Sequence, residues 1–190
     1  NEVNAEADLY NKEIFEEVQG KINELFTLYK NNPNLEKELR YTLFTTVPLF
    51  ISMNYNGENL LNAEQEKIIF DFALDQLEKP ITLQTDSANP YISALTVFAA
   101  LGQVGDGGST AVKRMVFSSV EAPQFHSYLL LTAVSALLAV KDYGAIRDIL
   151  SYFNQQESIF EAMDLLSVAN WVDYFQTING KYLGNMSSLA

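Results

Sequence analysis

Histidine is the side chain best suited to proton transfer at neutral pH, and this chain contains only His126. A Ser-His-acid triad would have to use it. The surrounding sequence has no Gly-x-Ser-x-Gly motif, and the neighbouring Pro123 and Phe125 favour a position near the start of a helix. A single histidine excludes a metal site built from histidines alone, and the absence of cysteine excludes disulfides and thiolate ligands. We therefore assign no catalytic residue, no metal ligand and no cofactor.

A glycine-rich segment, residues 105–110, has the composition of a phosphate-binding loop. A P-loop needs a preceding strand and a lysine after the last glycine, and neither is present. The alternating acidic ligands of a calcium loop are also missing. The segment is therefore predicted to be a turn between two helices, with Ser109 or Thr110 capping the second of them.

Two groups of carboxylates have helical spacing, and a carboxylate pair is enough for glycoside cleavage. Asp71 and Asp75 form the first group, and Glu157, Glu161 and Asp164 form the second. Like charges at these spacings repel one another mildly. Solvated helix faces or a cationic partner are therefore the first interpretation, and a carboxylate-dependent hydrolase stays open as an alternative.

The net charge of the sequence limits the kinds of partner that can be expected. The sequence has 24 acidic and 12 basic residues among 190, a net charge of −12. Nucleic acid and anionic membrane surfaces both need clustered lysine and arginine, so we expect neither as a partner. The longest apolar run, residues 128–140, is too short to cross a bilayer. We expect a soluble protein, either cytoplasmic or processed and exported, since it begins at Asn1 without a visible leader.

Apolar spacing predicts helices along most of the sequence. A long first helix carries an apolar stripe and ends before Pro33. A second helix is predicted from a cap at Asn34 to about residue 53, and it contains Pro48. A polar turn follows at 54–59. Asn62 and Gln65 then form a capping box that begins a third helix. Residues 81–88 are expected to form a loop, with Asn89 capping the next helix. The stripe comprises Val3, Ala7, Tyr10, Ile14, Val18, Ile22, Leu25 and Tyr29, and later helices are expected near 90–102, 109–121, 123–141, 143–155 and 158–175.

The second half of the sequence contains a repeat. Residues 91–106 align with 127–142 without a gap, which places Ala100 on Ala136 and Asp106 on Asp142. We expect the two alanines to allow close helix approach, and the two aspartates to accept hydrogen bonds at the start of the following helix. A helix pair that recurs at this period is typical of a stacked helical array.

The segment 100–116 carries Ala-Leu-Gly, then Gly-Asp, then Ala-Val, and resembles the HEAT-like repeats of the armadillo and lyase-type superfamily. The resemblance implies an all-α fold, a right-handed αα-superhelix of stacked helix pairs with about eight helices, and no shared catalytic residues. The expected organisation is a capping helix over 1–33, a repeat domain over 34–175 and a polar tail or linker over 176–190.

The resemblance favours a non-enzymatic interaction scaffold, or a subunit of a larger assembly, with a protein partner. Its groove would be lined by the second helices of the repeats, near Lys113, Arg114, Arg147 and Tyr152, and Trp171 and Tyr174 are further candidate contacts because aromatic residues dominate interfaces. A small-molecule or glycan-binding module stays open, as does an enzyme, either a hydrolase or a lyase-type repeat enzyme. Facing carboxylates in a deep pocket would favour the enzyme.

Overall fold

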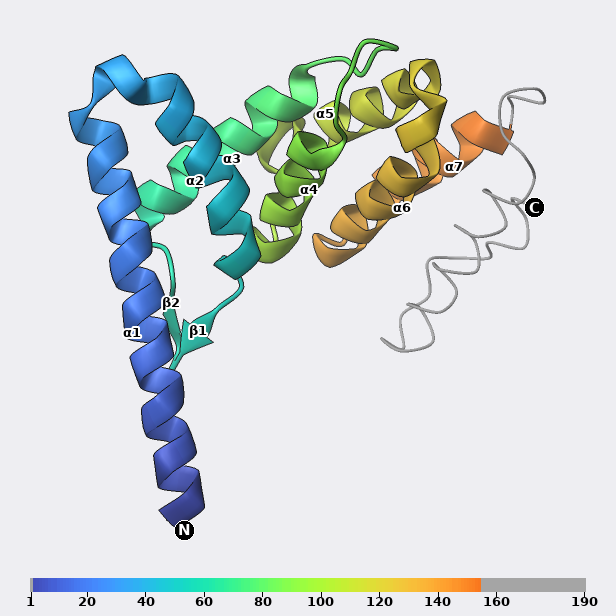
Figure 1. Ribbon diagram of the computed structural model, residues 1–190. Coiled ribbons are helices and arrows are strands. Elements are labelled where there is room, and N and C mark those ends of the chain that lie inside the picture. The colour runs from blue at the N-terminus through green and yellow to red at the C-terminus, as the bar shows by residue number, and fades with distance from the viewer. Residues whose placement is uncertain (1, 155–190) are drawn as a thin grey trace.

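Helices make up almost all the regular structure of the computed structural model, which describes residues 2–154 (Figure 1). The predicted all-α class is therefore confirmed. The α-helices are α1 (Glu2–Asn31), α2 (Glu36–Phe50), α3 (Ala63–Glu78), α4 (Asn89–Leu101), α5 (Gly105–Ser118), α6 (Pro123–Ala139) and α7 (Tyr143–Asn154). Two short 3-10 helices, η1 (Pro33–Leu35) and η2 (Ser119–Glu121), precede α2 and α6. The helix expected at 158–175, the carboxylates Glu157, Glu161 and Asp164, and the aromatic residues Trp171 and Tyr174 lie outside the described residues.

The helices that follow α1 pack in two rows. In one row α4 contacts both α2 and α6, and in the other α5 contacts both α3 and α7. The rows share one hydrophobic core, to which α1 also contributes. The two aligned copies differ in one respect, since α6 packs directly on α7, whereas α5 packs chiefly on α3, α6 and α7 rather than on α4.

The capping box that opens α3 is confirmed. The Asn62 side chain accepts a hydrogen bond from the Gln65 backbone N–H at 3.0 Å, and the Gln65 side chain accepts one from the Asn62 N–H at 3.0 Å. Gln65 also donates to the Asn23 side chain at 2.7 Å. The box therefore begins α3 and ties it to α1.

Three other predicted caps are wrong. The backbone around Asn34 forms η1, so Leu35 occupies the cap position of α2. Helix α4 begins at Asn89 itself, with Ala88 at the cap. Helix α5 begins at Gly105, so Ser109 and Thr110 lie inside the helix and cannot cap it. In each case the helix or a 3-10 turn starts at or before the polar residue that was expected to cap it.

Residues 54–59 form a tight hairpin in which β1 (Asn54–Tyr55) pairs antiparallel with β2 (Glu58–Asn59). Its two turn residues, Asn56 and Gly57, have φ of 50° and 82°. Positive φ at both central residues is the mark of a type I′ turn, for which Asn-Gly is the preferred pair. The hairpin lies against α1.

The apolar stripe of α1 is only partly covered. Ile22 of the stripe is buried, as are Phe15 and Phe26 on the same helix, while Tyr10 of the stripe is 64% exposed and its neighbour Leu9 is 57% exposed. With 30 residues α1 is about 45 Å long, and the 15-residue α2 spans about 22 Å. One neighbour of that length cannot cover the whole stripe, so the first turns of α1 project beyond it (Figure 1).

Candidate functional site

His126 belongs to the core, where it lies beside a buried serine. It is buried at the start of α6, and its Nδ1 lies 2.7 Å from the hydroxyl of Ser119, which is fully buried. That hydroxyl donates to the Val116 carbonyl at 2.6 Å. A hydroxyl has one proton to donate, so the hydrogen bond to His126 runs from the ring N–H to Ser119. The pair ties η2 to α6 and has no exposed nucleophile.

The carboxylates of α3 are solvated and individually paired with cations. Asp71 binds Lys67 at 2.6 Å, and Asp75 binds Arg40 at 2.5 Å and Lys79 at 3.2 Å. About half of each carboxylate side chain is exposed, at 55% and 50%. This arrangement favours the solvated-face interpretation, because a general acid needs an enclosed site that raises its pKa.

The four predicted binding residues within the described range lie on α5 and α7, which contact each other. Lys113 binds Asp148 across these helices at 2.7 Å, and the Tyr152 ring packs on Phe117 with centroids 4.1 Å apart. Arg114 and Arg147 are exposed, and neither forms an ion pair with any residue between 2 and 154. Lys113 and Tyr152 therefore hold the two helices together, which leaves the arginines free to contact a partner.

Asp142 starts α7, as its place in the repeat predicted. Its Oδ1 accepts a hydrogen bond from the Ala145 N–H at 3.0 Å, and its Oδ2 accepts one from the Ser109 hydroxyl of α5. The Ser109 bond lowers the pKa of Asp142, and the Ala145 and Gly144 amides and the charge of Lys113 act in the same direction against the effect of burial. Asp106 aligns with Asp142 in the repeat, and its side chain lies outside the part of the protein that the structure describes.

Asp142→Ala is expected to lower the free energy of unfolding by about 1 kcal/mol at neutral pH, since a helix cap is lost. Because folding lowers the pKa of this carboxyl, its contribution is fully present above the ordinary value of about 3.9 and is lost as the pH falls through the folded value. Urea unfolding of the wild type and the variant between about pH 7 and pH 3 should show the gap closing in acid. A gap that is constant with pH would contradict the assignment.

The two helix rows differ sharply in charge. Residues 41–57, 89–105 and 122–140 contain no Asp, Glu, Lys or Arg, and these ranges cover α4, α6 and all of α2 after its first turns. The row of α3, α5 and α7 carries charges on every helix. Apart from the first turns of α2, this row of neighbouring helices therefore carries no charged residue, although its outer side faces solvent.

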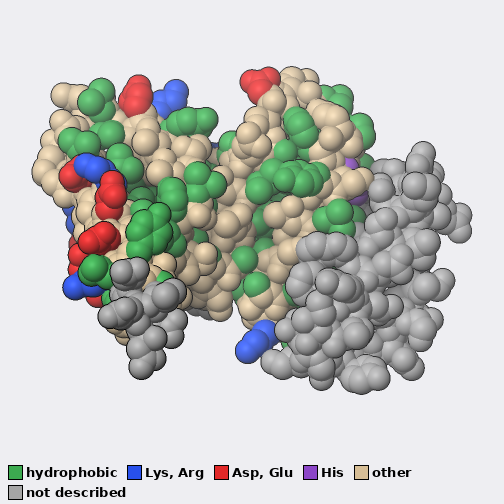
Figure 2. All heavy atoms as spheres, turned by 60° about the horizontal axis from the view of Figure 1, so that its bottom comes forward, with side chains coloured by type: hydrophobic (Ala, Val, Ile, Leu, Met, Phe, Trp, Pro, Cys, Tyr) green, Lys and Arg blue, Asp and Glu red, His purple; other side chains and the backbone are tan. Residues whose placement is uncertain are grey.

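We call the exposed side of this row the uncharged face. In Figure 2 green and tan side chains fill the middle of the visible surface, and red and blue ones lie at its margins. Tyr41, Leu49 and Tyr128 are 65%, 75% and 60% exposed. The remaining members of the face are Thr42, Thr45, Ser93, Thr96, Ala100, Thr132 and Ser135.

Most serine and threonine hydroxyl groups of the uncharged face already form a hydrogen bond within their own helix. Five of them donate to the carbonyl four residues earlier in their own helix, at 2.8–3.0 Å. These are Thr42, Thr45, Thr96, Thr132 and Ser135. Polar groups that keep their hydrogen bonds can leave water at low cost, so this face is suited to close contact with another surface.

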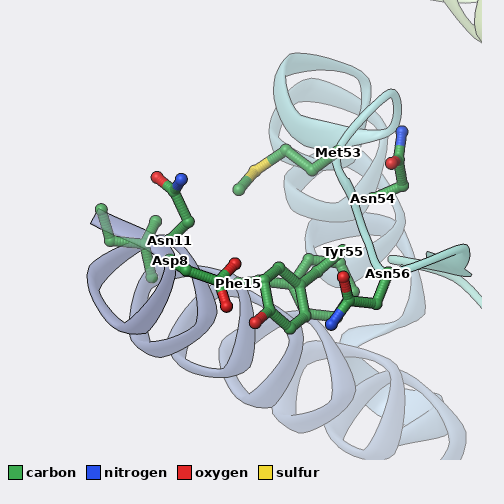
Figure 3. Close-up of a pocket in the computed structure, with 8 residues that line it drawn as sticks. Asp8, Asn11, Phe15, Met53, Asn54, Tyr55 and Asn56 are labelled. Atoms are coloured by element: carbon green, nitrogen blue, oxygen red, sulfur yellow. The ribbon is translucent and has the colours of Figure 1, made fainter. Parts of the chain in front are cut away.

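A cleft of about 320 Å³ lies between α1 and the hairpin (Figure 3). Ile14, Phe15 and Met53 supply its apolar part, and Asp8 is the only carboxylate among the described residues that line it. Partial burial raises the pKa of Tyr55 at its edge, and the hydrogen bond and charge of Asp8 raise it further. The described lining residues therefore include no carboxylate pair of the kind that glycoside cleavage uses.

A second hollow, of about 180 Å³, lies among the first turns of α2, the end of α3 and the start of α4. Lys37, Arg40 and Lys79 line it, and none of its lining residues in the described part of the chain is acidic. Its other lining residues are Tyr41, Phe44, Phe72, Gln76 and Pro90. We call this hollow the cationic notch.

Comparison of the sequence with protein-family models, with characterised proteins and with solved structures finds no significant match. Within residues 2–154, no three histidine, aspartate or glutamate side chains converge as a metal site requires. None of the helices in that range is both long and apolar enough to cross a membrane.

Proposed function

We propose that this protein is a non-enzymatic interaction scaffold, or a subunit of a larger assembly, that docks a protein on its uncharged face. The observation that carries this proposal is the lack of any charged residue on α4, α6 and most of α2 in a protein with net charge −12. Charged residues are depleted at the cores of protein interfaces. A surface that needed only to stay in water would gain solubility from charge.

The packing of the helices supports a HEAT-like repeat scaffold as the framework. Stacked helix pairs place their first helices in one row and their second helices in another, so that each unit covers the apolar side of the next. The contacts of α2 with α4 and of α4 with α6, alongside those of α3 with α5 and of α5 with α7, follow this order. Such a framework presents a long surface of repeated helices to a partner.

The uncharged face is preferred to the α5–α7 side that carries Lys113, Arg114, Arg147 and Tyr152. Lys113 and Tyr152 already have partners within the fold, so releasing them would cost interactions that hold α7. Surface charges such as Arg114 and Arg147 steer association more than they strengthen it. The α5–α7 side, which carries these two arginines, is therefore the second surface that the capture experiment below must examine.

Placing one carboxylate in the middle of the face is the direct test. Tyr128→Glu and Ala100→Glu each put a charge on an exposed position of the face, and Thr110→Glu puts the same charge on an exposed position of α5. Each tagged variant, and the wild type, is used to capture proteins from native extract. We expect the first two variants to lose a stoichiometric partner at least tenfold, about 1.4 kcal/mol, because an unpaired charge is buried on docking.

Thr110→Glu should capture that partner as the wild type does. Helical content by circular dichroism and the thermal midpoint confirm that all three variants are folded. Loss of the partner with Thr110→Glu alone would move the docking surface to the α5–α7 row. Equal capture by the wild type and all three variants would contradict docking on either row.

A further inference from the structure

The cationic notch brings together an unusual share of the protein's positive charge. The sequence has 12 basic residues against 24 acidic ones, yet Lys37, Arg40 and Lys79 come from two helices to line a single hollow. Asp75 lies outside the hollow and binds Arg40 and Lys79 through the same oxygen, Oδ2. It neutralises one of the three charges, so the notch keeps an excess of positive charge.

The guanidinium of Arg40 is held in place before any ligand arrives. Its Cζ lies 4.4 Å from the centroid of the Phe72 ring, and the Phe72 ring meets Tyr29 edge-on at 5.5 Å. Phe72 is buried, so the platform under Arg40 is fixed by the core. A planar guanidinium with a fixed orientation is suited to bind a carboxylate through two parallel hydrogen bonds.

The walls of the notch are apolar. Phe44, Phe72 and Pro90 line it beside the cations, and Tyr41 lines it while its side chain is 65% exposed. The volume of about 180 Å³ is below the range of about 300–1,000 Å³ typical of small-molecule sites. The hollow therefore fits one side chain with an attached anionic group.

Tyr41 belongs both to the notch and to the uncharged face. From this continuity we infer that the notch binds a carboxylate attached to an apolar side chain, such as a polypeptide C-terminus ending in Phe or Leu, on the partner that docks along α2. The inference rests on the proposed function, because it assigns the carboxylate to that partner. The apolar side chain would lie against Phe44 and Tyr41, and the carboxylate would meet Arg40 and Lys37.

The test uses N-acetyl-L-phenylalanine as a stand-in for such a terminus, titrated into the full-length protein and followed by nuclear magnetic resonance. N-acetyl-L-phenylalaninamide is the matched uncharged probe, and inorganic phosphate is the matched anion without an apolar group. We expect saturable shifts of the Arg40 side chain and the Phe44 and Phe72 rings with the acid. The amide and phosphate should each bind at least tenfold more weakly.

Lys37→Glu reverses one charge of the notch without removing an ion pair, because Lys37 is exposed and has no such partner within residues 2–154. An acidic residue in the first turn of α2 also suits the helix dipole, so the variant should fold. It should bind the acid at least tenfold more weakly. Lys21→Glu reverses the charge of a lysine on α1 that is 68% exposed and lies far from the notch in the sequence. This control also removes the exposed Lys21–Glu24 ion pair, and it should bind as the wild type does.

Absence of binding by the acid, equal binding of acid and amide, or equal binding by the two variants would each overturn the inference. Phosphate that binds as tightly as the acid would also overturn it, since the apolar walls would then contribute nothing. These results need no partner, so they are distinct from a failure of the uncharged face to dock one. Partner capture that persists when the acid saturates the notch would overturn the assignment of the carboxylate to the partner.

Discussion

Ala136→Asp is expected to unfold the packed helices. Ala136 is 2% exposed on α6, and α6 packs against α4, α5 and α7. An aspartate here would place a carboxylate among apolar side chains, at a cost of several kcal/mol that is comparable with the whole stability of a domain of this size. We expect the cooperative thermal transition followed by circular dichroism to shift far down or to disappear.

Ala139→Asp is the matched control, because Ala139 ends the same helix and is exposed. It introduces the same carboxylate into water, and its thermal midpoint should stay close to that of the wild type. Equal midpoints for Ala136→Asp and the wild type would contradict the packing of α6 against α4, α5 and α7.

Gly105→Ala is expected to destabilise the protein by about 2–5 kcal/mol. The φ of Gly105 is +59°, and a Cβ built there would lie 2.7 Å from Cζ of Phe70. The left-handed backbone costs a non-glycine residue about 1–2 kcal/mol, and overpacking costs about 1–3 kcal/mol. The Phe70 ring cannot easily move away, since it stacks on buried Phe98 with centroids 5.1 Å apart.

Gly107→Ala separates these two costs. Gly107 has φ of +89°, and no atom lies within 4 Å of its added Cβ, so only the backbone cost of about 1–2 kcal/mol applies. Urea unfolding measures the loss of stability in both variants, and it can be compared directly if their m-values equal that of the wild type. Equal losses of stability would show that the contact between Gly105 and Phe70 has no energetic weight.

Local signals in the sequence predicted the helices well. Prolines at 33 and 80 follow the ends of the first and third helices, and Asn62 with Gln65 begins α3. These features act within a few residues of themselves, so they can be recognised without knowing the fold. The cap at Asp142 was predictable for the same reason.

Features that depend on distant contacts were missed. The glycine segment was predicted to be a turn, but α5 already begins at Gly105, which lies against Phe70 of α3. Ser109 was expected to cap a helix and instead donates to Asp142. Ala100 and Ala136 occupy the same place in the repeat, yet Ala100 is exposed and Ala136 is buried. The two copies also differ in packing, since α6 packs on α7, whereas α5 packs chiefly on helices other than α4.

The candidate surface was also visible in the sequence, although not as a motif. Three uncharged stretches, 41–57, 89–105 and 122–140, recur along an acidic sequence. Only the packing of α2 with α4 and of α4 with α6 shows that they form one row. The cationic notch could not be predicted, because Lys37 and Lys79 are far apart in the sequence and meet only when α2 and α3 pack.

Hydroxyl-radical footprinting of the protein, alone and with its captured partner, tests the central claim most directly, because it reads the solvent exposure of single side chains. Tyr41, Leu49 and Tyr128 report on the uncharged face, and Leu9, Tyr10 and Leu83 are comparably exposed residues elsewhere. We predict that the partner protects the first three and leaves the oxidation of the other three unchanged. Protection of Leu9 and Tyr10, with Tyr41, Leu49 and Tyr128 as reactive as in the free protein, would contradict the account.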